Sequence, residues 1–363
     1  MIDAISLRLL RLPLRTPYKL AFGPVTHFDT ILARVIADGR MGLGEATILT
    51  GYTNETIGES WARVRAAAKE LPGIGTQAAK SIVASSLKDA PFTATALTTA
   101  IEMAEGHPVL RVAEPVAVPL LAGINAMDHE AIAAEIEDAL DAGYGTLKIK
   151  AGFDVEEDLK RMAFIQQSNG GRARLRIDAN QGYDREAGCR FASTVDPSGI
   201  ELLEQPCPAG DWDGLEAVCK VTAVPLMLDE SIYDEADIER AARIGASFVK
   251  LKLMKCVSLD RLVQGLALIA ELGMEPVLGN GVASDIGCWM EACAARAHIR
   301  NAGEMNGFLR QSVALAQPPL TVEDGAMTLM PEGAPQLDES ALERLTIQTA
   351  CFDKTSRMAG SRI

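Results

Sequence analysis

From about Val116 onward, short apolar runs alternate with longer stretches in which apolar residues recur at helical spacing. Three of the helix-like stretches are DHEAIAAEIEDALDAG at 128–143, DEADIERAARIG at 234–245 and SLDRLVQGLALIAELG at 258–273. Each of these ends in glycine, the residue type that is common just past a helix end. The pattern therefore predicts strand and helix in alternation along this part of the chain.

The apolar runs between these stretches are short enough to be buried strands of a parallel sheet. They are VAVPLLAGI (116–124), TLKIKAG (146–152), LRIDANQ (175–181), IELLEQP (200–206), LMLDES (226–231), FVKLKLMK (248–255), EPVLGNG (275–281) and AGEMNGF (302–308). About eight repeats at roughly 25-residue intervals are typical of an α/β barrel with an outer ring of helices. An open doubly wound sheet is the competing topology, but the GxGxxG and GxxxxGK[ST] nucleotide motifs are absent from the sequence.

The first part of the chain has a different texture. ISLRLLRLPL (5–14) and TILARVIAD (30–38) alternate as strands do, and DGRMGLGEA (38–46) predicts a glycine-bearing turn followed by a further strand. Residues from about 55 to 105 predict several helices. We therefore expect an α+β domain over 1–112, a barrel over 113–316, and a segment over 317–363 that packs back on the first domain.

Lysines occupy alternate positions in two of the expected barrel strands. Lys148 and Lys150 alternate with apolar residues in TLKIKAG, and Lys250 and Lys252 do so in FVKLKLMK. Because side chains alternate between the two faces of a strand, both pairs are expected to point into the barrel. Lys255 is out of phase with its neighbours and is expected to be a solvated loop residue.

Carboxylates end the three expected strands that lie between the two lysine strands. They are Asp178, Glu204 and Asp229. In such a barrel the carboxyl ends of the strands meet at one mouth, so three anions would converge and repel one another there. A divalent cation removes this conflict, and an all-oxygen ligand set favours Mg²⁺, with Mn²⁺ possible. Glu230 is the second choice as a ligand, because it should point to the opposite face from Asp229.

Lysines on both sides of a divalent cation suggest proton transfer at a carbon atom next to a carboxylate. Removing that α-proton produces a dianionic enediolate, which a cation bound to the carboxylate stabilises. A lysine on one face can remove the proton, and a lysine on the other face can return one. We expect mutual repulsion and the cation to lower the pKa values of these lysines.

Composition and charge exclude some classes of function. The formal net charge of −14 argues against binding to nucleic acid, whose phosphates attract basic surfaces. The seven cysteines include no CxxC pair and lie among apolar residues, which indicates reduced core thiols. No signal peptide or membrane-length apolar run is evident, so we expect a cytoplasmic protein.

The motifs LKIKAG, RIDANQGYD, IELLEQP, LMLDESI and KLKLMK, in this order, resemble those of the enolase superfamily. They are most similar to its muconate-lactonizing subgroup, which includes dipeptide epimerases, o-succinylbenzoate synthases and muconate cycloisomerases. GLGEA at 42–46 resembles part of the family's capping domain. The resemblance implies an α/β fold: a modified TIM (β/α)-barrel with an N-terminal α+β capping domain that the C-terminal segment completes.

The resemblance also implies roles for individual residues. The family uses a lysine or histidine base with Mg²⁺. Carried over by position, Lys150 and Lys252 would be the acid–base pair, with Lys148 and Asn180 in support. The Mg²⁺ ligands implied in this way are Asp178, Glu204 and Asp229.

Substrate contacts are expected from the capping loops near 17–28 and 49–56, with Tyr18, Phe22 and Tyr52 as candidates. Where dipeptide epimerases have an Asp-x-Asp pair that binds a substrate amino group, this chain has Glu304-Met305-Asn306. Glu304 retains a charge for an ammonium group, whereas Asn306 weakens the dipeptide interpretation. Asn280 and Asp285 either face the substrate or shape a glycine-rich turn.

The favoured hypothesis is a Mg²⁺-dependent racemase or epimerase of an amino acid or an N-substituted amino acid. A lyase or cycloisomerase could use the same site, and the sequence does not decide between them. A Schiff-base aldolase barrel would use an inward lysine but leaves three carboxylates unexplained. A non-catalytic metal-binding protein ranks last. We expect a small-molecule carboxylate substrate and assembly into a homo-oligomer.

Overall fold

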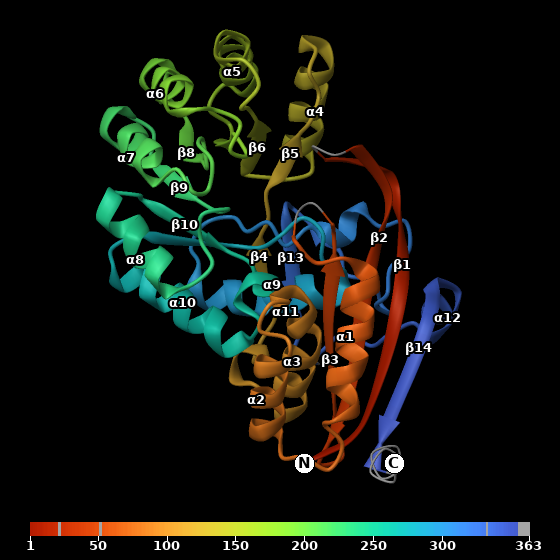
Figure 1. Cartoon of the computed structure of the whole chain (residues 1–363). Helices are drawn as coiled ribbons and strands as arrows, with labels where there is room; N and C mark the ends of the chain where they lie inside the picture. Colours follow the sequence, from red (N-terminus) through yellow and green to blue (C-terminus); the bar gives the residue numbers. More distant parts are fainter. Residues whose placement is uncertain (21–22, 51–52, 332, 355–363) are drawn as a thin grey trace.

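The barrel is the larger part of the molecule (Figure 1). The structure is a computed structural model that describes residues 1–20, 23–50, 53–331 and 333–354. Seven parallel strands form one sheet in the order β11-β10-β9-β8-β7-β6-β5. They are β5 (Ala122–Ile124), β6 (Thr146–Lys150), β7 (Arg174–Asp178), β8 (Ile200–Glu204), β9 (Leu226–Leu228), β10 (Phe248–Leu251) and β11 (Glu275–Leu278).

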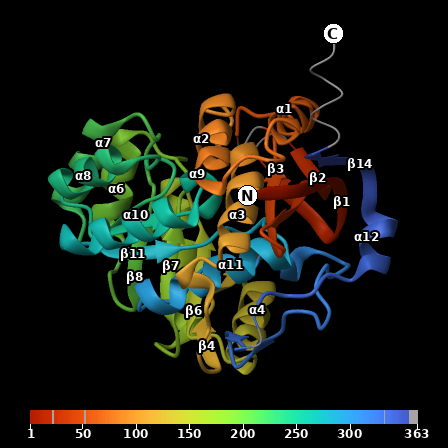
Figure 2. The ribbon, with the colours of Figure 1, turned by 90° about the horizontal axis from the view of Figure 1, so that it is seen from below.

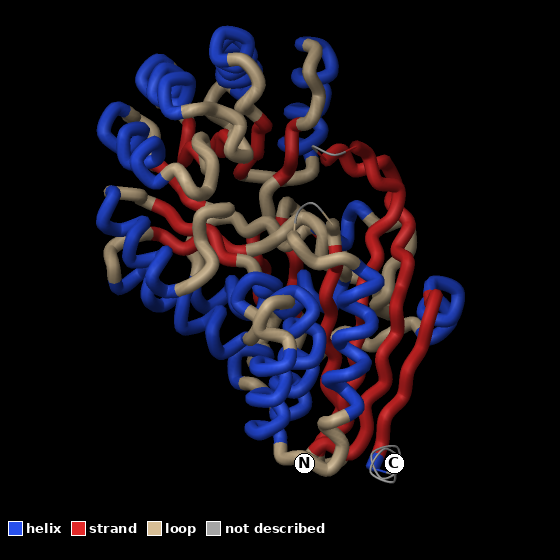
Figure 3. The backbone as a smooth tube through the Cα atoms, viewed as in Figure 1, coloured by secondary structure: helices blue, strands red, loops and turns tan. Residues whose placement is uncertain are grey.

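Helices follow most of these strands and lie outside them (Figure 3). They are α4 (His129–Asp141), α5 (Val155–Asn169), α6 (Arg185–Thr194), α7 (Trp212–Val221), α8 (Glu235–Ile244), α10 (Leu259–Glu271) and α11 (Asp285–His298). A further short helix, α9 (Leu253–Cys256), lies at the carboxyl end of β10. Local sequence explains their ends: Asp128, Asp234 and Ser258 each accept a hydrogen bond from a first-turn N–H. The barrel predicted from the alternation of strand and helix is confirmed.

Alternate side chains of the barrel strands contribute to two separate apolar clusters. Leu147 and Ile149 point outward and belong to the main hydrophobic core, to which residues of the helices also contribute. A separate small cluster consists of buried side chains from four consecutive strands, Leu202, Met227, Phe248 and Val277. Period-two geometry therefore directs apolar side chains to the helices and leaves the other face of each strand for the barrel interior.

An irregular segment takes the eighth position, where the pattern predicted a strand over 302–308. The segment pairs with strand neighbours on both sides: Glu304 N donates to Leu278 O (2.9 Å), and Leu121 N donates to Gly303 O (3.0 Å). Gly279 adopts φ +124°, and a Cβ there would lie 2.7 Å from the carbonyl carbon of Glu304. The segment forms only an isolated bridge at Gly303 and turns into η2 at Gly307, so the strand predicted over 302–308 was wrong.

The capping domain contains a four-stranded antiparallel sheet in the order β14-β1-β2-β3 (Figure 2). Its strands are β1 (Ile2–Leu20), β2 (Gly23–Ala37), β3 (Arg40–Ile48) and β14 (Thr346–Asp353), and its helices are α1 (Ile57–Lys69), α2 (Thr76–Ser86) and α3 (Pro91–Glu105). Because Ala4 lies opposite Asp353 in the β1–β14 register, the C-terminal segment completes this domain as expected. The exact domain boundaries remain a prediction.

The remaining elements connect these two parts. They are η1 (Pro108–Leu110), β4 (Val116–Pro119), η2 (Gly307–Arg310), β12 (Val322–Glu323), β13 (Ala326–Leu329) and α12 (Glu339–Leu345). The run 116–124, expected as one strand, divides into β4 and β5, because β4 pairs with β13 in a small antiparallel sheet of its own.

The GLGEA motif places β3 against the helix α3. A Cβ on Gly42 would lie 2.0 Å from Ala100 O, and one on Gly44 would lie 2.3 Å from Ala96 O. Since no side chain tolerates such distances, both glycines are required for the backbones to approach. The motif thus has a packing role within the capping domain.

Buried glutamates join the capping domain to the barrel. Glu45 of GLGEA accepts hydrogen bonds from the backbone N–H and the hydroxyl of Ser284, at the start of α11. Burial raises the pKa of Glu45 to about 7, against the hydrogen bonds from Ser284, which lower it. Glu102 on α3 accepts a hydrogen bond from Leu259 N (2.7 Å) at the start of α10. Both carboxyl groups therefore satisfy helix N-termini across the domain interface.

Glu45 is expected to make stability depend on pH. Because its pKa of about 7 in the folded protein exceeds its ordinary 4.5, the folded chain keeps a proton that the unfolded chain loses. This contribution to the free energy of unfolding is complete below pH 4.5 and is lost as the pH rises through 7. The free energy of unfolding should therefore decline between pH 4.5 and 7 in the natural protein. In Glu45→Gln this decline should be smaller by up to about 3 kcal/mol. Urea unfolding at several pH values measures it, with exposed Glu343→Gln as the control; an unchanged pH slope contradicts the assignment.

Four of the seven cysteines are buried as expected, but Cys351 is exposed on β14, because every second side chain of this edge strand points to solvent. None of the helices in the described part of the chain is both long and apolar enough to cross a membrane.

Candidate active site

The three strand-end carboxylates come together at the carboxyl ends of β7, β8 and β9. Asp178 lies opposite Glu204 in the β7–β8 register, and Asp229 directly follows β9. None of the three is more than 2% exposed. The lysine strands flank them, because the sheet order runs β6, β7, β8, β9, β10. The carboxylates thus lie between two lysine-bearing strands.

The ammonium groups of the inward lysines contact these carboxylates directly. Lys148 Nζ lies 2.9 Å from Asp178 Oδ2 and 2.9 Å from Glu204 Oε2. On the other side, Lys250 Nζ lies 3.1 Å from Glu204 Oε1. Lys148, Lys150, Lys250 and Lys252 all line one pocket together with Asp178 and Asp229. The predicted sharing of one face by each lysine pair is therefore present in the structure.

The outer lysine of each pair has its own carboxylate partner. Lys150 Nζ lies 2.7 Å from Asp178 Oδ2, and Lys252 Nζ lies 2.7 Å from Asp229 Oδ2. The two differ in exposure: the Lys150 side chain is 42% exposed, whereas that of Lys252 is 6% exposed. One of the two proposed acid–base groups is thus open at the pocket mouth, and the other is enclosed.

The pKa values of the inner lysines move in the opposite direction from the sequence expectation. Burial acts to lower the pKa of Lys148, but Asp178, Glu204 and Glu304 outweigh burial and raise this pKa. Burial likewise acts to lower the pKa of Lys250, but the neighbouring carboxylates outweigh burial and raise this pKa well above its ordinary value. At these two lysines the contacting carboxylates therefore outweigh the repulsion between lysines, and the effect of a bound cation on the pKa values stays a prediction.

The carboxylates themselves divide into two groups. Burial acts to raise the pKa values of Asp178 and Asp229, but contacting lysines outweigh it and hold both pKa values below the usual range. Burial and the like charge of Asp178 instead raise the pKa of Glu204 to about 7. Asp178 and Asp229 therefore remain anionic, which suits cation binding. Of the three, Glu204 is the carboxylate whose anionic form a nearby positive charge would stabilise most.

Lys255 is buried, although the sequence predicted a solvated loop residue. Its Nζ donates to Asp229 O (2.8 Å) and lies 3.3 Å from Asp229 Oδ1. The short helix α9 begins directly after Lys252, so the period of two ends there, and the helical turn brings Lys255 back beside Lys252. Lys255 thus belongs to the environment of Asp229.

Asn180 and Glu230 complete the edge of the pocket. Asn180 adopts φ 43°, a left-handed conformation that asparagine tolerates, and its Nδ2 donates to Glu230 Oε1 (3.1 Å). Lys150 Nζ donates to Asn180 Oδ1. Asn180 therefore connects a proposed catalytic lysine to Glu230, in agreement with the supporting position expected for it.

Gln205 has a role that the sequence did not suggest. This residue is fully buried, and its Oε1 accepts hydrogen bonds from Asp229 N (3.0 Å) and Ser231 N (3.2 Å). Its Nε2 donates to Ser231 Oγ (2.7 Å). The side chain therefore fixes the backbone on both sides of Glu230. The only sequence signal was its place directly after Glu204 at a strand end.

The predicted substrate contacts are only partly brought together. Tyr18, Asn280 and Glu304 line the pocket. Asn306 is not among the lining residues; its Nδ2 donates to Leu121 O (3.3 Å). Phe22 and Tyr52 lie outside the described residues.

Asn280 and Asp285 have different functions in the fold. Asn280 faces the pocket and also shapes its own turn, since its Oδ1 accepts hydrogen bonds from Val282 N (3.0 Å) and Ala283 N (2.9 Å). Asp285 is buried at the start of α11, and its Oδ2 accepts a hydrogen bond from Leu315 N (2.8 Å). Asp285 therefore anchors a distant segment, and it is not among the residues that line the pocket.

The residues in the pocket fit a hard divalent cation. The candidate ligands Asp178, Glu204 and Asp229 supply only oxygen atoms, which Mg²⁺ and Mn²⁺ prefer. Asp178 and Asp229 line the pocket, whereas Glu204 is not among the lining residues and contacts two lysines that are, Lys148 and Lys250. Glu230 Oε2 is buried in the pocket wall and has no hydrogen-bond partner among the described residues. The cavity has a volume of about 60 Å³, enough for a cation and a few water molecules. An unpaired buried carboxylate oxygen beside further carboxylates is the environment that a cation stabilises.

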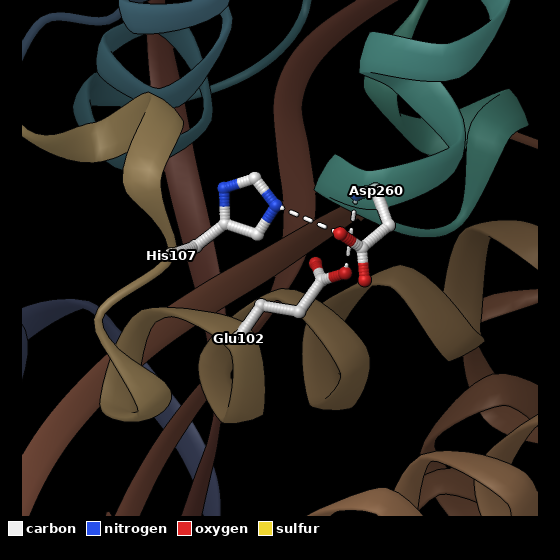
Figure 4. A group of neighbouring side chains, drawn as sticks. All are labelled: Glu102, His107 and Asp260. Carbon is white, nitrogen blue, oxygen red and sulfur yellow. Dashed lines mark hydrogen bonds and ion pairs between the residues drawn. The ribbon is translucent and has the colours of Figure 1, made fainter.

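A second group has the spacing of metal ligands. Glu102, His107 and Asp260 offer ligand atoms within 4.8 Å of one another (Figure 4). Protein donors already engage them: His107 Nε2 lies 3.0 Å from Asp260 Oδ1, and both Glu102 oxygens accept backbone N–H groups. The group includes a nitrogen ligand, which Mg²⁺ seldom takes. It lies where α3 meets α10, apart from the pocket residues, and its observed contacts join the two domains.

Comparison with known proteins identifies the family. The model of the family "Enolase C-terminal domain-like" matches residues 131–335. This chain belongs to that family. It is 31% identical over 270 residues to the L-Lys-D/L-Arg epimerase of Methylococcus capsulatus, covering 69% of this chain and 74% of the relative. It is 28% identical to muconate cycloisomerase 1 of Rhodococcus opacus, covering 92% and 94% of the two chains.

The fold has close counterparts among solved structures. A dipeptide epimerase from Cytophaga hutchinsonii, complexed with Mg and the dipeptide D-Ala-L-Val, superposes with a TM-score of 0.86. The match covers 97% of this chain and 100% of that chain at 21% identity, so it supports the fold. The family and the relatives together confirm the enolase superfamily resemblance and make this chain an enzyme of the isomerase or lyase type.

Proposed function

We propose that this enzyme removes and returns the α-proton of a carboxylate substrate, as a Mg²⁺-dependent racemase or epimerase of an amino acid or an N-substituted amino acid. One observation carries the proposal. Lys150 ends β6 and Lys252 directly follows β10, and these two strands flank the three strands whose carboxyl ends carry Asp178, Glu204 and Asp229. Both lysines line the same pocket. A base on each side of a bound carbon atom is the requirement for inverting its configuration.

The chain's own residues would divide the work as follows. Lys150 and Lys252 exchange a proton with the two faces of the α-carbon, one acting as base and the other as acid. Lys148 lies between Asp178, Glu204 and Glu304 and stays positively charged, so it can hold the substrate carboxylate or balance the carboxylates around it. Asn180 orients Lys150 through the contact at its Oδ1.

Asp178, Glu204 and Asp229 would hold the Mg²⁺ ion, with the unpaired oxygen of Glu230 beside them. The chemistry that Mg²⁺ supplies when bound is positive charge next to the substrate carboxylate, where negative charge accumulates once the proton has left. The lysines that contact Asp178 and Asp229 keep these two carboxylates anionic and ready to bind a cation.

A cycloisomerase or lyase is the second candidate function. Muconate cycloisomerase 1 of Rhodococcus opacus matches over more of the chain than the epimerase does, at slightly lower identity. In that case one lysine would transfer the proton, and the other would remain a cation near the substrate. The location and assembly expected from the sequence, a cytoplasmic homo-oligomer, remain predictions.

The test of the proposed function is α-proton exchange in D₂O. Single enantiomers of N-acyl amino acids, dipeptides and cyclic amino acids are incubated with the enzyme and Mg²⁺. We expect one class to gain deuterium at the α-carbon and to approach a mixture of both configurations. Exchange should cease in EDTA and return with Mg²⁺. One-way ring opening or loss of water without racemisation would favour the cycloisomerase or lyase. A substrate adduct that borohydride traps, together with activity that persists in EDTA, would contradict both candidate functions.

A further inference from the structure

Arg310 is not itself a lining residue of the pocket, but it borders two residues that are, Tyr18 of the capping domain and Gly281 of the barrel. It is the last residue of η2, the 3₁₀ turn that follows the segment closing the barrel. Its guanidinium carbon lies 4.8 Å from the centre of the Tyr18 ring. Tyr18 itself lines the pocket. This stacking holds the guanidinium in a fixed orientation beside the capping loop.

At this point the pocket wall is a glycine, and the guanidinium of Arg310 lies behind it. Gly281 lines the pocket, and a Cβ at this position would lie 3.5 Å from Arg310 Nε and 3.6 Å from Arg310 Nη2. The backbone of Gly281 does not have a positive φ, so its conformation does not demand glycine. The absence of a side chain therefore leaves a path from the pocket to the guanidinium.

The polar atoms along this path lack partners. Arg310 Nε and Asn306 Oδ1 are buried, and neither has a hydrogen-bond partner within the described ranges. A Cβ on Gly281 would also lie 3.6 Å from Asn306 Oδ1, so the two unpaired atoms border the same space. Because buried polar atoms without partners are rare in folded proteins, a ligand that supplies an acceptor to Arg310 fits this place.

The charge balance around the pocket points to the same conclusion. Five carboxylates face five lysines: Asp178, Glu204, Asp229, Glu230 and Glu304 against Lys148, Lys150, Lys250, Lys252 and Lys255. Arg310 is an additional cation, and no ion pair of Arg310 occurs within the part of the chain that the structure describes. A guanidinium without an ion pair beside a pocket attracts an anionic group, and its planar fork suits a carboxylate.

We infer that Arg310 determines specificity by binding a second carboxylate of the substrate, remote from the carbon atom that exchanges its proton. The inference rests on the proposed function and deepens it, because it assigns the substrate a second negative charge. That carboxylate can lie at the end of an N-acyl group or on the second residue of a dipeptide. Tyr18 orients Arg310, and Gly281 keeps the path to it open.

Two matched pairs of ligands test the inference. N-succinyl-alanine is compared with N-succinamoyl-alanine, and Ala-Glu is compared with Ala-Gln, so that each pair differs only by a carboxylate and its amide. Dissociation constants are measured by titration calorimetry with the full chain and Mg²⁺. One pair should show an approximately 10- to 100-fold preference for the carboxylate, the range for a charge-assisted hydrogen bond. The pair that shows it identifies where the second carboxylate lies.

Arg310→Met keeps an unbranched, flexible apolar stem but removes the guanidinium and its charge. We expect this variant to lower the preference to within about threefold of unity, and Arg310→Lys to retain part of it. Arg300→Met, at an exposed position ten residues earlier, is the matched control and should keep the full preference.

The possible failures can be distinguished. If neither pair shows a preference in the natural protein, or if Arg310→Met keeps it, the inference is overturned while α-proton exchange can still support the proposed function. If the preference depends on Arg310 but no compound exchanges its α-proton, the proposed function fails and the carboxylate site stands.

Discussion

Replacing either Lys150 or Lys252 with alanine should reduce interconversion of the two substrate enantiomers by about 10²- to 10⁴-fold, the usual contribution of a positioned acid or base. Inversion requires a proton donor on the face opposite the base, so loss of one lysine interrupts it in both directions. Polarimetry or chiral chromatography measures the loss.

Exchange with D₂O should separate the two faces. Lys252→Ala should still exchange the α-proton of the enantiomer that presents it to Lys150, and Lys150→Ala should exchange only the opposite enantiomer. Lys150 is 42% exposed and Lys252 only 6%, so the proton on Lys150 should exchange more readily with solvent. Deuterium at the α-carbon, followed by NMR for each pure enantiomer, reports this selectivity.

A surface lysine supplies the control for these variants. Lys160 on α5 is 69% exposed and pairs with Glu157, so Lys160→Ala should leave both interconversion and exchange unchanged. If Lys150→Ala and Lys252→Ala each retain full exchange from both enantiomers, the assignment of an opposed acid–base pair is wrong. If only one of the two variants loses product formation, a cycloisomerase in which a single lysine transfers the proton is favoured.

The alternation of residues in TLKIKAG was enough to predict which side chains enter the barrel. Leu147 and Ile149 pack outward, whereas Lys148 and Lys150 line the pocket, because a strand's geometry repeats every two residues. The same rule failed for Lys255, since the strand ends at Leu251 and a helical turn begins at Leu253. Periodicity is informative only within an element, and the sequence did not mark where this element ends.

Contacts between distant parts of the chain were harder to predict. Gln205 and Glu45 are each polar residues in recognisable motifs, but their partners Ser231 and Ser284 lie elsewhere in the sequence. Arg310 was likewise not singled out, because its significance depends on Tyr18 of the capping domain and on the absence of a side chain at Gly281. Such roles arise from tertiary packing, which local patterns do not encode.

Replacing Asp178 with asparagine should weaken Mg²⁺ binding by at least about 100-fold, since even residues that only support a metal ligand contribute 10- to 100-fold to affinity. Asparagine retains the shape of aspartate and the acceptor for Asn180 N, so the loss would reflect charge rather than misfolding. Calorimetric titration of the protein with Mg²⁺ measures the affinity and the number of ions bound, and the thermal melting temperature checks the fold.

The group of Glu102, His107 and Asp260 provides the decisive comparison, because its spacing also suits a metal. Since its atoms already bond to one another and to the start of α10, His107→Gln should leave Mg²⁺ affinity and α-proton exchange unchanged. If Mg²⁺ affinity fell in His107→Gln but not in Asp178→Asn, the Mg²⁺ site would have to be reassigned to the domain interface. The opposite result, with exchange falling in parallel with affinity in Asp178→Asn, would tie the cation to the pocket that the lysines line.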